Sequence, residues 1–216
     1  MSRLNRRQEG TIVALDIKAA FDRAWHKGLL VKLVANGVRG QLLQWLSSYL
    51  MDRHIHVVVN GQTSKPTPIN ATVPQGSIIG PTLFLVYNNN LCDNLHNPPC
   101  LCADDGTIDC LLDEVNATIS LSKDLQKIYG WGQKWNVRFA TEKCKVMSLS
   151  RRLPSEHPPE FFMGGKLLQH VHELDILGVR FSRSLGFQFH VNSIAVRAGQ
   201  RLSALRSIAP YLDRHG

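Results

Sequence analysis

Three aspartates are the residues of this chain best suited to metal-dependent chemistry. Asp16 lies near the end of a short apolar run, TIVALDI (11–17), and Asp104 and Asp105 lie together in CLCADDGTIDC (100–110). Carboxylates in apolar surroundings are costly unless they are neutralised or bind a cation. Mg²⁺ prefers oxygen ligands and is held by one or two carboxylates and substrate phosphates. If the two segments are neighbouring strands, the aspartates form a two-metal site for phosphoryl or nucleotidyl transfer.

The same aspartates also fit simpler interpretations. Asp104-Asp105-Gly106 predicts the tip of a tight β-hairpin, which needs no ligand. A disulfide or zinc framework is another interpretation, because cysteines surround the pair. The five cysteines are odd in number and include no Cys-x-x-Cys pair, which disfavours both. We expect free, mostly buried thiols. The remaining alternative is a zinc site made by four cysteines: Cys92, Cys100, Cys102 and Cys110.

Length and composition indicate a globular chain with a basic C-terminal third. The 216 residues suit one compact domain, or one domain and part of another, and 44% hydrophobic residues suit a folded core. No run of about 18 apolar residues and no signal-peptide pattern is visible, so we expect an intracellular protein, nuclear or cytoplasmic. Residues 143–216 contain 11 Lys and Arg against 5 Asp and Glu. This surplus favours nucleic acid as a partner, with a solvated basic face as the alternative.

Periodicity and turn residues predict a mixture of helices and strands. Helices are expected at 27–36, 40–50, 113–135 and 191–208, and after the loop that opens 73–91, with Pro81 in the first turn. Strands are expected on both sides of the aspartate pair and at 11–17, 54–61, 67–73, 145–150, 160–163, 166–170 and 175–182. A polar, Pro-rich connector is expected at 151–160. This order predicts an α+β domain built on an antiparallel sheet.

Three stretches, in this order, closely resemble the palm motifs of reverse transcriptases. They are ALDIKAAFDRAWH (14–26), VPQGSIIGPTLFLVYNNNL (73–91) and CADD (102–105). The resemblance is strongest to the reverse transcriptases of non-LTR retrotransposons of the LINE or jockey type, ahead of those of group II introns and retrons. It extends over nearly the whole chain through TEKCKVMSLSRR (141–152) and LLQHVHELDILGVRFSRSLGFQFHV (167–191).

This resemblance implies a right-hand polymerase palm, an antiparallel sheet backed by helices, in an RNA-directed DNA polymerase. Residues 1–185 would form the palm with partial fingers-like insertions, and residues 186–216 the start of the thumb. The implied partners are an RNA template, a DNA primer and dNTPs, and the implied cofactor is Mg²⁺ (two ions), or Mn²⁺. Because the chain starts just before Asp16, we expect a truncated polymerase without most of the fingers. The alternative is an inactive remnant that only binds nucleic acid.

The resemblance also implies roles for the acidic residues and one lysine. Asp16, Asp104 and Asp105 would be catalytic and would bind the metal ions, together with the carbonyl group of Ile17. Lys143 would be catalytic near the pyrophosphate, where it can stabilise or protonate the leaving group. A solvated surface lysine is the alternative interpretation of Lys143.

A nucleotide pocket is implied by two further segments. Phe21 would lie under the incoming sugar, where a flat ring leaves no room for a 2′-OH; core packing is the alternative. Gln75 and Gly76 would lie beside the nucleotide and template, because Gln donates and accepts hydrogen bonds and Gly permits close backbone approach. Ser77 is either a helix cap or a substrate contact, and Asp22 is expected to cap a helix rather than bind metal.

The basic C-terminal helix resembles the start of a thumb. Its three arginines, Arg197, Arg201 and Arg206, would contact phosphates of the template–primer duplex. Two other positions depart from the family pattern. Cys102 replaces the aromatic residue that usually precedes the aspartates, which we expect to loosen primer positioning. Asn90 replaces an Asp, which we expect to remove a structural charge.

Overall fold

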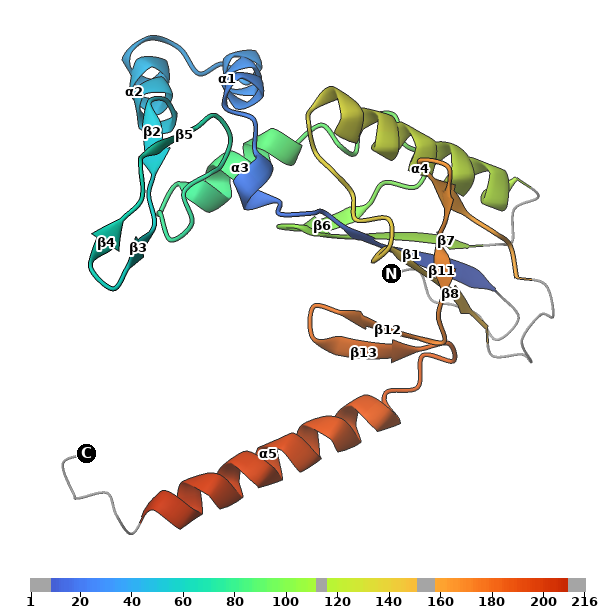
Figure 1. Cartoon of the computed structure of the whole chain (residues 1–216). Coiled ribbons are helices and arrows are strands. Elements are labelled where there is room, and N and C mark those ends of the chain that lie inside the picture. Colours follow the sequence, from blue (N-terminus) through green and yellow to red (C-terminus); the bar gives the residue numbers. More distant parts are fainter. Residues whose placement is uncertain (1–8, 112–115, 151–157, 210–216) are drawn as a thin grey trace.

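A five-stranded sheet forms the centre of the protein (Figure 1). The computed structural model describes residues 9–111, 116–150 and 158–209. The sheet order is β11-β8-β1-β7-β6, and β1 is antiparallel to both of its neighbours, while β11 runs parallel to β8. The strands are β1 (Gly10–Asp16), β6 (Cys100–Cys102), β7 (Asp105–Leu111), β8 (Lys145–Leu149) and β11 (Gln169–His170). The predicted antiparallel α+β architecture is therefore confirmed.

The alternation of side chains along β1 decides which of its residues face the core. Val13 and Leu15 belong to the main apolar core, together with buried residues of α3 (Gly80–Asn88) and α4 (Ala117–Lys134). Ile12 belongs to a smaller cluster on the opposite face, where it packs with Leu174 of β12 (Glu173–Ile176). Because successive side chains alternate between faces, Asp16 shares the face of Ile12. The helices thus cover one face, and the aspartate lies on the other.

Two helices and a projecting hairpin separate β1 from α3. The predicted helices are confirmed as α1 (His26–Ala35) and α2 (Gly40–Leu50), after a short 3-10 helix, η1 (Phe21–Arg23). The expected long strands are broken into two short pairs. These are β2 (Arg53–Ile55) with β5 (Thr67–Ile69), and β3 (Val58–Val59) with β4 (Gln62–Thr63).

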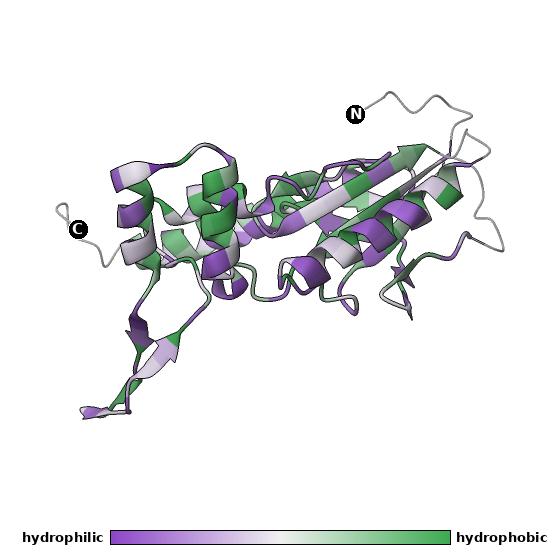
Figure 2. Ribbon diagram, turned by 90° about the horizontal axis from the view of Figure 1, so that it is seen from above, coloured by the Kyte–Doolittle hydropathy of each residue, from purple (hydrophilic) through white to green (hydrophobic). Residues whose placement is uncertain are grey.

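The turn of this hairpin follows the sequence prediction. Asn60 and Gly61 join β3 to β4 with φ of 50° and 77°, the positive values that an Asn-Gly hairpin turn requires. Figure 2 shows the hairpin extending away from the helices. Its β3 valines are exposed, so no core side chains hold the pairing in one continuous ladder.

The C-terminal segments form short hairpins and a long helix. They are β9 (Phe162–Met163), β10 (Lys166–Leu167), β12, β13 (Val179–Ser182) and α5 (Gln188–Ile208). The prediction of one strand at 175–182 is wrong, because Leu177 and Gly178 turn the chain with positive φ values of 49° and 78°. β12 and β13 therefore pair with each other.

The single strand predicted at 166–170 is split into β10, which pairs with β9, and β11, which pairs with β8. The remaining boundaries agree with the sequence prediction within a few residues. The helix after the 73–79 loop is α3, with Pro81 in its first turn. The first residues predicted for the 113–135 helix, and 151–157 of the connector, lie outside the described residues. Within the described ranges, no helix has the length and apolar character needed to span a membrane.

Candidate active site

The pairing of β1 with β7 brings two of the predicted catalytic aspartates together. Asp16, the last residue of β1, lies directly opposite Asp105, the first residue of β7. Opposed residues of antiparallel strands have Cβ atoms about 4.5–5.5 Å apart, where like charges repel. Next along the ladder, Leu15 faces Gly106, and a Cβ at Gly106 would lie 3.3 Å from the Leu15 side chain. Glycine at 106 thus allows tight packing beside the carboxylates.

The third aspartate lies in the turn that leads into β7. Cys102 pairs with Asp105, so Ala103 and Asp104 form a two-residue turn, with Ala103 at φ 55°. The predicted tip at Asp104-Asp105-Gly106 is therefore wrong by about one residue, since Asp105 and Gly106 belong to the strand. Asp104 and Asp105 are both exposed. The turn places Asp104 next to the opposed pair without extending the ladder.

The carboxyl group of Asp105 is partly shielded from water and lies near two other carboxylates. Burial raises the pKa of its carboxyl group, and the charges of Asp104 and Asp16 raise this pKa further. Lys143 offers partial compensation, with its Nζ 4.0 Å from Oδ1 of Asp16 and its side chain 68% exposed. A divalent cation would relieve the same repulsion, so the donor chemistry fits an oxygen-ligated metal. The described residues nevertheless include no cluster of three His, Cys, Asp or Glu side chains gathered for a metal ion.

The five cysteines were the other possible metal ligands or disulfide partners. All five are free thiols in the structure, and none of those described belongs to a metal-binding cluster. Cys110 and Cys144 are buried, as expected. Cys100 and Cys102 are exposed, so the expectation of mostly buried thiols is wrong for this strand. β6 lies at the edge of the sheet and has a neighbouring strand, β7, on one side only.

The end of β1 is held by the segment that carries Lys143. The amide of Ala140 donates to the Asp16 carbonyl at 2.9 Å, and the amide of Lys18 donates to the Arg138 carbonyl at 2.8 Å. These two bonds flank Ile17, whose own carbonyl takes no part in them. Consecutive carbonyls of an extended strand point to opposite sides. The Ile17 carbonyl is therefore directed away from this segment.

The predicted nucleotide-pocket residues gather around α3. The Phe21 ring stacks on Phe84 of α3 at a centroid distance of 4.6 Å, yet Phe21 remains only half-buried. The loop that precedes α3 begins beside it, because the Val73 amide donates to the Phe21 carbonyl at 2.8 Å. Gly76 has a φ of 78°, and both Gln75 and Gly76 are exposed. Phe21, Gln75 and Gly76 thus belong to one region of the surface.

Ser77 and Asp22, the two residues considered as helix caps, have different roles in the structure. Ser77 Oγ donates to the Pro74 carbonyl at 2.6 Å and accepts from the Gly80 amide at 3.1 Å, so it supports the start of α3. Asp22 caps no helix, because the N-cap of α1 is Trp25. Instead, the Asp22 carboxylate accepts a hydrogen bond from Nε2 of Gln75 at 3.0 Å. The capping prediction for Asp22 is therefore wrong.

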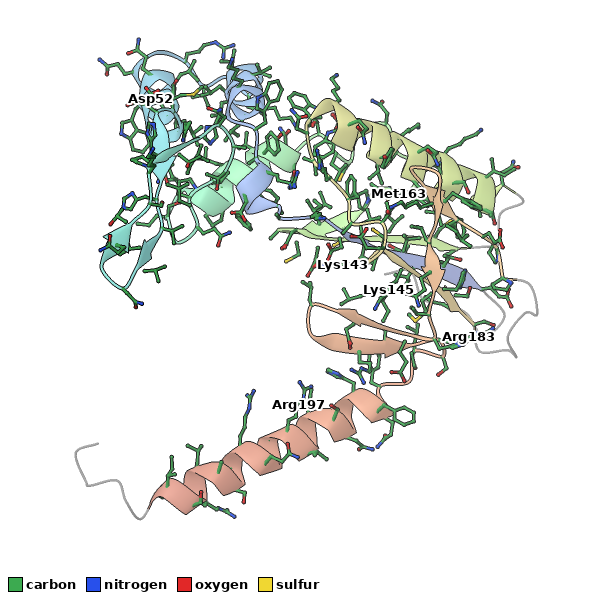
Figure 3. All side chains as sticks on the ribbon, in the orientation of Figure 1. Asp52, Lys143, Lys145, Met163, Arg183 and Arg197 are labelled. Atoms are coloured by element: carbon green, nitrogen blue, oxygen red, sulfur yellow. The ribbon has the colours of Figure 1, made fainter. Side chains whose placement is uncertain are left out.

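The three arginines lie apart from the aspartates. Arg197, Arg201 and Arg206 are exposed on α5, which packs only its beginning against β13. Figure 3 labels Lys143 near the sheet and Arg197 on the separate helix. The structure therefore groups the carboxylates with Lys143 and leaves the arginines as a second, distinct surface.

One polar cluster was missed by the sequence analysis. Lys32 is only 3% exposed, and its Nζ lies over the rings of Trp131 and Trp135, 4.8 and 4.0 Å from their centroids. Its Nζ donates to Oδ1 of Asn90 at 2.6 Å, and Nε1 of Trp131 donates to the same oxygen at 2.9 Å. Asn90 thus has the structural role expected of that position. The only signal in the sequence was a lysine on the apolar face that also contains Leu29 and Leu33.

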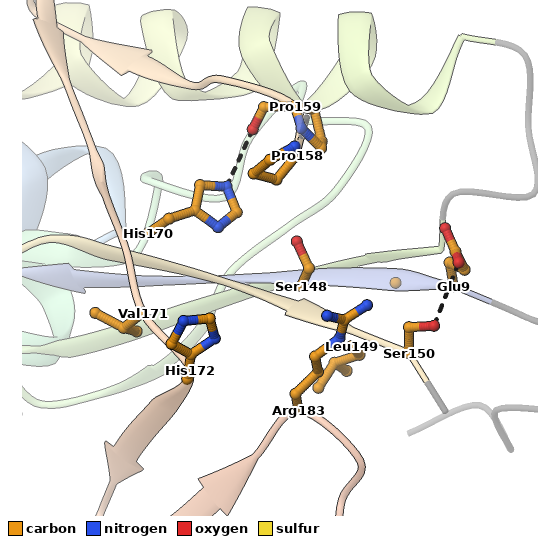
Figure 4. A pocket seen from close by; sticks show the side chains of 11 residues that line it. Glu9, Ser148, Leu149, Ser150, Pro158, Pro159, His170, Val171, His172 and Arg183 are labelled. Carbon is orange, nitrogen blue, oxygen red and sulfur yellow. Dashed lines mark hydrogen bonds between the residues drawn. The ribbon is translucent and has the colours of Figure 1, made fainter. Parts of the chain in front are cut away.

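A separate cavity lies at the other end of the sheet (Figure 4). Its volume is about 140 Å³, and Gly10 and Leu149 line it, at the far end of β1 from Asp16. Seven strand residues at about 3.4 Å each separate the two ends by roughly 20 Å. Inside it, Ser150 Oγ donates to Oε1 of Glu9 at 3.2 Å. This cavity is not part of the carboxylate site.

Comparison with known proteins identifies the class to which this palm-like sheet and its opposed carboxylates belong. Residues 2–181 match the reverse transcriptase (RNA-dependent DNA polymerase) family, and the chain belongs to that family, in its non-LTR retrotransposon branch. The RNA-directed DNA polymerase from mobile element jockey of Drosophila melanogaster is 33% identical over 191 residues, which cover 83% of this chain. The jockey polymerase of Drosophila funebris is 35% identical over 192 residues.

More distant similarities support the same fold. The Pol polyprotein of the type-1 retrotransposable element R2 from Popillia japonica is 26% identical over 185 residues, covering 79% of this chain and 30% of that protein. Apo telomerase from Candida tropicalis shares the fold with a TM-score of 0.53 at 11% identity, over 82% of this chain and 35% of that one. The chain spans about one fifth of the length of the jockey polymerases.

Proposed function

We propose that this chain is the catalytic palm of an RNA-directed DNA polymerase, which adds dNTPs to a primer 3′-OH on an RNA template. The observation that carries this proposal is the direct cross-strand opposition of Asp16 and Asp105, with Asp104 in the adjoining turn. Partial burial, together with the charges of Asp104 and Asp16, raises the pKa of the Asp105 carboxyl group, and a bound cation would relieve the repulsion among the three carboxylates.

A divalent metal, Mg²⁺ or Mn²⁺, suits this donor set, and reverse transcriptases depend on divalent metals in general. Asp16, Asp105, Asp104 and the carbonyl of Ile17 would hold two ions. When bound, such ions activate the primer hydroxyl and neutralise the charge of the leaving pyrophosphate.

The other site residues would bind and orient the substrates. Lys143 lies beside Asp16 and supplies a positive charge where the pyrophosphate charge develops. Phe21, a half-buried ring stacked on Phe84, would lie under the incoming sugar, and Gln75 and Gly76 provide an exposed loop next to it. The Phe21–Phe84 stack fixes the position of this ring, which a steric test of the 2′ position requires.

The thumb boundary remains a prediction. In this proposal, residues 1–185 form the palm and residues 186–216 begin the thumb. Arg197, Arg201 and Arg206 would then contact phosphates of the template–primer duplex, because they are exposed on a helix that makes few contacts of its own.

The test is Asp104→Asn in the full-length protein that contains this chain. We expect incorporation of dTTP on poly(rA)/oligo(dT) to fall to background, because the amide cannot replace a carboxylate ligand. The matched control is Asp109→Asn. Asp109 is an exposed aspartate of β7, the strand that follows Asp104, and lies opposite Ile12 and away from the site, so this variant should retain activity. If Asp104→Asn still incorporates dTTP, the metal assignment is wrong.

The second candidate function is nucleic-acid binding without catalysis. The observation that favours it is α5, a 21-residue helix with no buried residue that presents three arginines. Salt-sensitive binding of the template–primer, combined with no metal-dependent incorporation by the wild-type protein, would support this alternative and contradict the polymerase proposal.

A further inference from the structure

Two segments of the nucleotide region are fastened side by side by backbone hydrogen bonds. The Val73 amide donates to the Phe21 carbonyl at 2.8 Å, and the Thr72 amide donates to the Ala24 carbonyl at 3.0 Å. Nε2 of His26 donates to the Thr72 carbonyl at 2.8 Å. These bonds therefore hold the first residues of the loop, Thr72 and Val73, against the segment around Phe21.

The tip of the loop reaches the same segment through one side-chain contact. Nε2 of Gln75 donates to Oδ1 of Asp22 at 3.0 Å. In the described part of the chain, the side chains of Asp22 and Gln75 make no other hydrogen bond. Ser77 folds the tip onto Pro74, and Gly76 turns it with a positive φ. The Asp22 carboxylate therefore determines how the Gln75 side chain is held.

The chemistry of this pair fixes the orientation of the Gln75 amide. An ionised carboxylate only accepts hydrogen bonds, so Gln75 must turn its NH₂ group toward Asp22. Its Oε1 and the second N–H then face elsewhere, available to a ligand beside Phe21. A bond to a charged acceptor is also stronger than one between neutral groups. Without Asp22, the amide is free to rotate and to present either end.

Stability does not explain the pair. Asp22 and Gln75 are both exposed, and a hydrogen bond at the surface contributes little to folding because water replaces it. Asp22 also caps no helix. Removing the carboxylate should therefore leave the fold intact and affect only what the amide contacts.

We propose that Asp22 is a positioning residue that orients Gln75 for the deoxynucleoside triphosphate bound over Phe21. This inference rests on the proposed polymerase function, which places the nucleotide there. Asp22 would not touch the nucleotide or the metal ions. Its effect would pass through the Gln75 amide alone, so the two side chains must be energetically coupled.

The experiment is a double-mutant cycle in the full-length protein, with Asp22→Ala, Gln75→Ala and the double variant. Steady-state incorporation of dTTP on poly(rA)/oligo(dT), measured over a range of dTTP concentrations, gives KM and kcat separately. We expect Asp22→Ala to raise KM about tenfold with a much smaller change in kcat, because a binding interaction is lost. The double variant should be no worse than Gln75→Ala. Asp22→Asn keeps an acceptor oxygen and should recover most of the affinity, while Asp109→Ala is the matched control.

Three results would overturn the inference. They are multiplicative KM effects in the double variant, an Asp22→Ala variant with unchanged KM, and a loss of activity that follows a fall in Tm. Binding of dTTP to the complex with a dideoxy-terminated primer provides the same cycle without turnover. Coupled binding in a protein that does not incorporate dTTP would support the Asp22 inference while the polymerase proposal fails. If Asp104→Asn abolishes incorporation but Asp22 and Gln75 are not coupled, the polymerase proposal is supported and the Asp22 inference fails.

Discussion

The two long helices of this protein differ in what surrounds them. α4 has 18 residues and α5 has 21. On α4, Leu121, Leu125 and Ile128 are completely buried against the sheet. On α5 no residue is buried, and its large apolar side chains range from 47% exposed at Ile194 to 74% at Phe189. Similar lengths of helix therefore have opposite environments.

The two helices contribute to the protein in different ways. α4 fills the core behind β1 and β7, so it fixes the strands that bring Asp16 and Asp105 together. Because packing, not propensity, supplies most helix stability in proteins, α5 receives little stabilisation from the described contacts. The three arginines of α5 are exposed. In the proposed function, the palm positions the chemistry and α5 offers a binding surface.

The largest test of the contrast is a matched pair of truncations. Leu125→Ala on α4 should lower the free energy of unfolding by about 2–5 kcal/mol, because it leaves a cavity in the core. Leu202→Ala on α5 should change it by no more than about 0.5 kcal/mol, because Leu202 is already 48% exposed. Urea unfolding followed by circular dichroism measures both. Equal losses would mean that α5 is packed as tightly as α4.

A second test addresses the charges of α5. Replacing its three arginines, Arg197, Arg201 and Arg206, by Gln should weaken binding to an RNA–DNA duplex. If each contacts one phosphate, the slope of log Kd against log salt should fall by about 2–3. The measurement is fluorescence anisotropy between 50 and 200 mM salt.

The control for this test removes the same charge elsewhere. It replaces three exposed lysines of the palm and helical region with Gln, namely Lys27, Lys123 and Lys166. The salt slope should change less in this variant than in the arginine variant. If both variants lose the same slope, binding follows net charge and α5 has no special role.

The smallest effect concerns the buried lysine that α4 helps to enclose. Burial lowers the pKa of Lys32 to about 8, against the opposing influence of Asp93. Below pH 8 the lysine is charged in both states and the cost of burying it is fully present. Between about 8 and the ordinary 10.5 only the unfolded chain keeps the proton, so stability rises with pH, by at most about 1.4 kcal/mol per unit.

Lys32→Met isolates this contribution. The raised pKa values of Cys92, Cys144 and Tyr87 act in the opposite direction as pH rises, so the wild-type curve alone is a sum. The difference between wild type and Lys32→Met, from urea unfolding at pH 7.5 to 9.5, should slope upward. A flat difference would contradict the lowered pKa.

The sequence predicted the parts of this fold that depend on local pattern. The β-branched run of β1, the Asn60-Gly61 turn and the helix after Pro81 were all found where periodicity and turn chemistry indicated. These three features are specified by residues near one another in the chain. The placement of Asp16 and the aspartate pair on neighbouring strands was only a condition for the two-metal site, and the pairing of β1 with β7 meets it.

Contacts between distant segments were the ones missed. The Asp22–Gln75 hydrogen bond joins residues 53 positions apart, and the Lys32–Asn90 bond joins residues 58 apart. Nothing in the local pattern distinguishes Asp22 from a helix cap or Lys32 from a solvated lysine. Asp22 gains its partner because η1 lies against the loop before α3, and Lys32 gains its partners because α1 lies near the end of α3 and near α4.

The exposed thiol of Cys102 has a practical consequence. It pairs in register with Asp105, whereas Cys110 and Cys144 are buried and Cys92 is half-buried. A maleimide reagent under mild conditions would therefore attach to β6, at Cys102 and its exposed neighbour Cys100. With Cys100 replaced by Ser, a single fluorophore or spin label would lie one strand away from the carboxylates. In the proposed polymerase, a label at this residue would report on the approach of a primer end to the carboxylates.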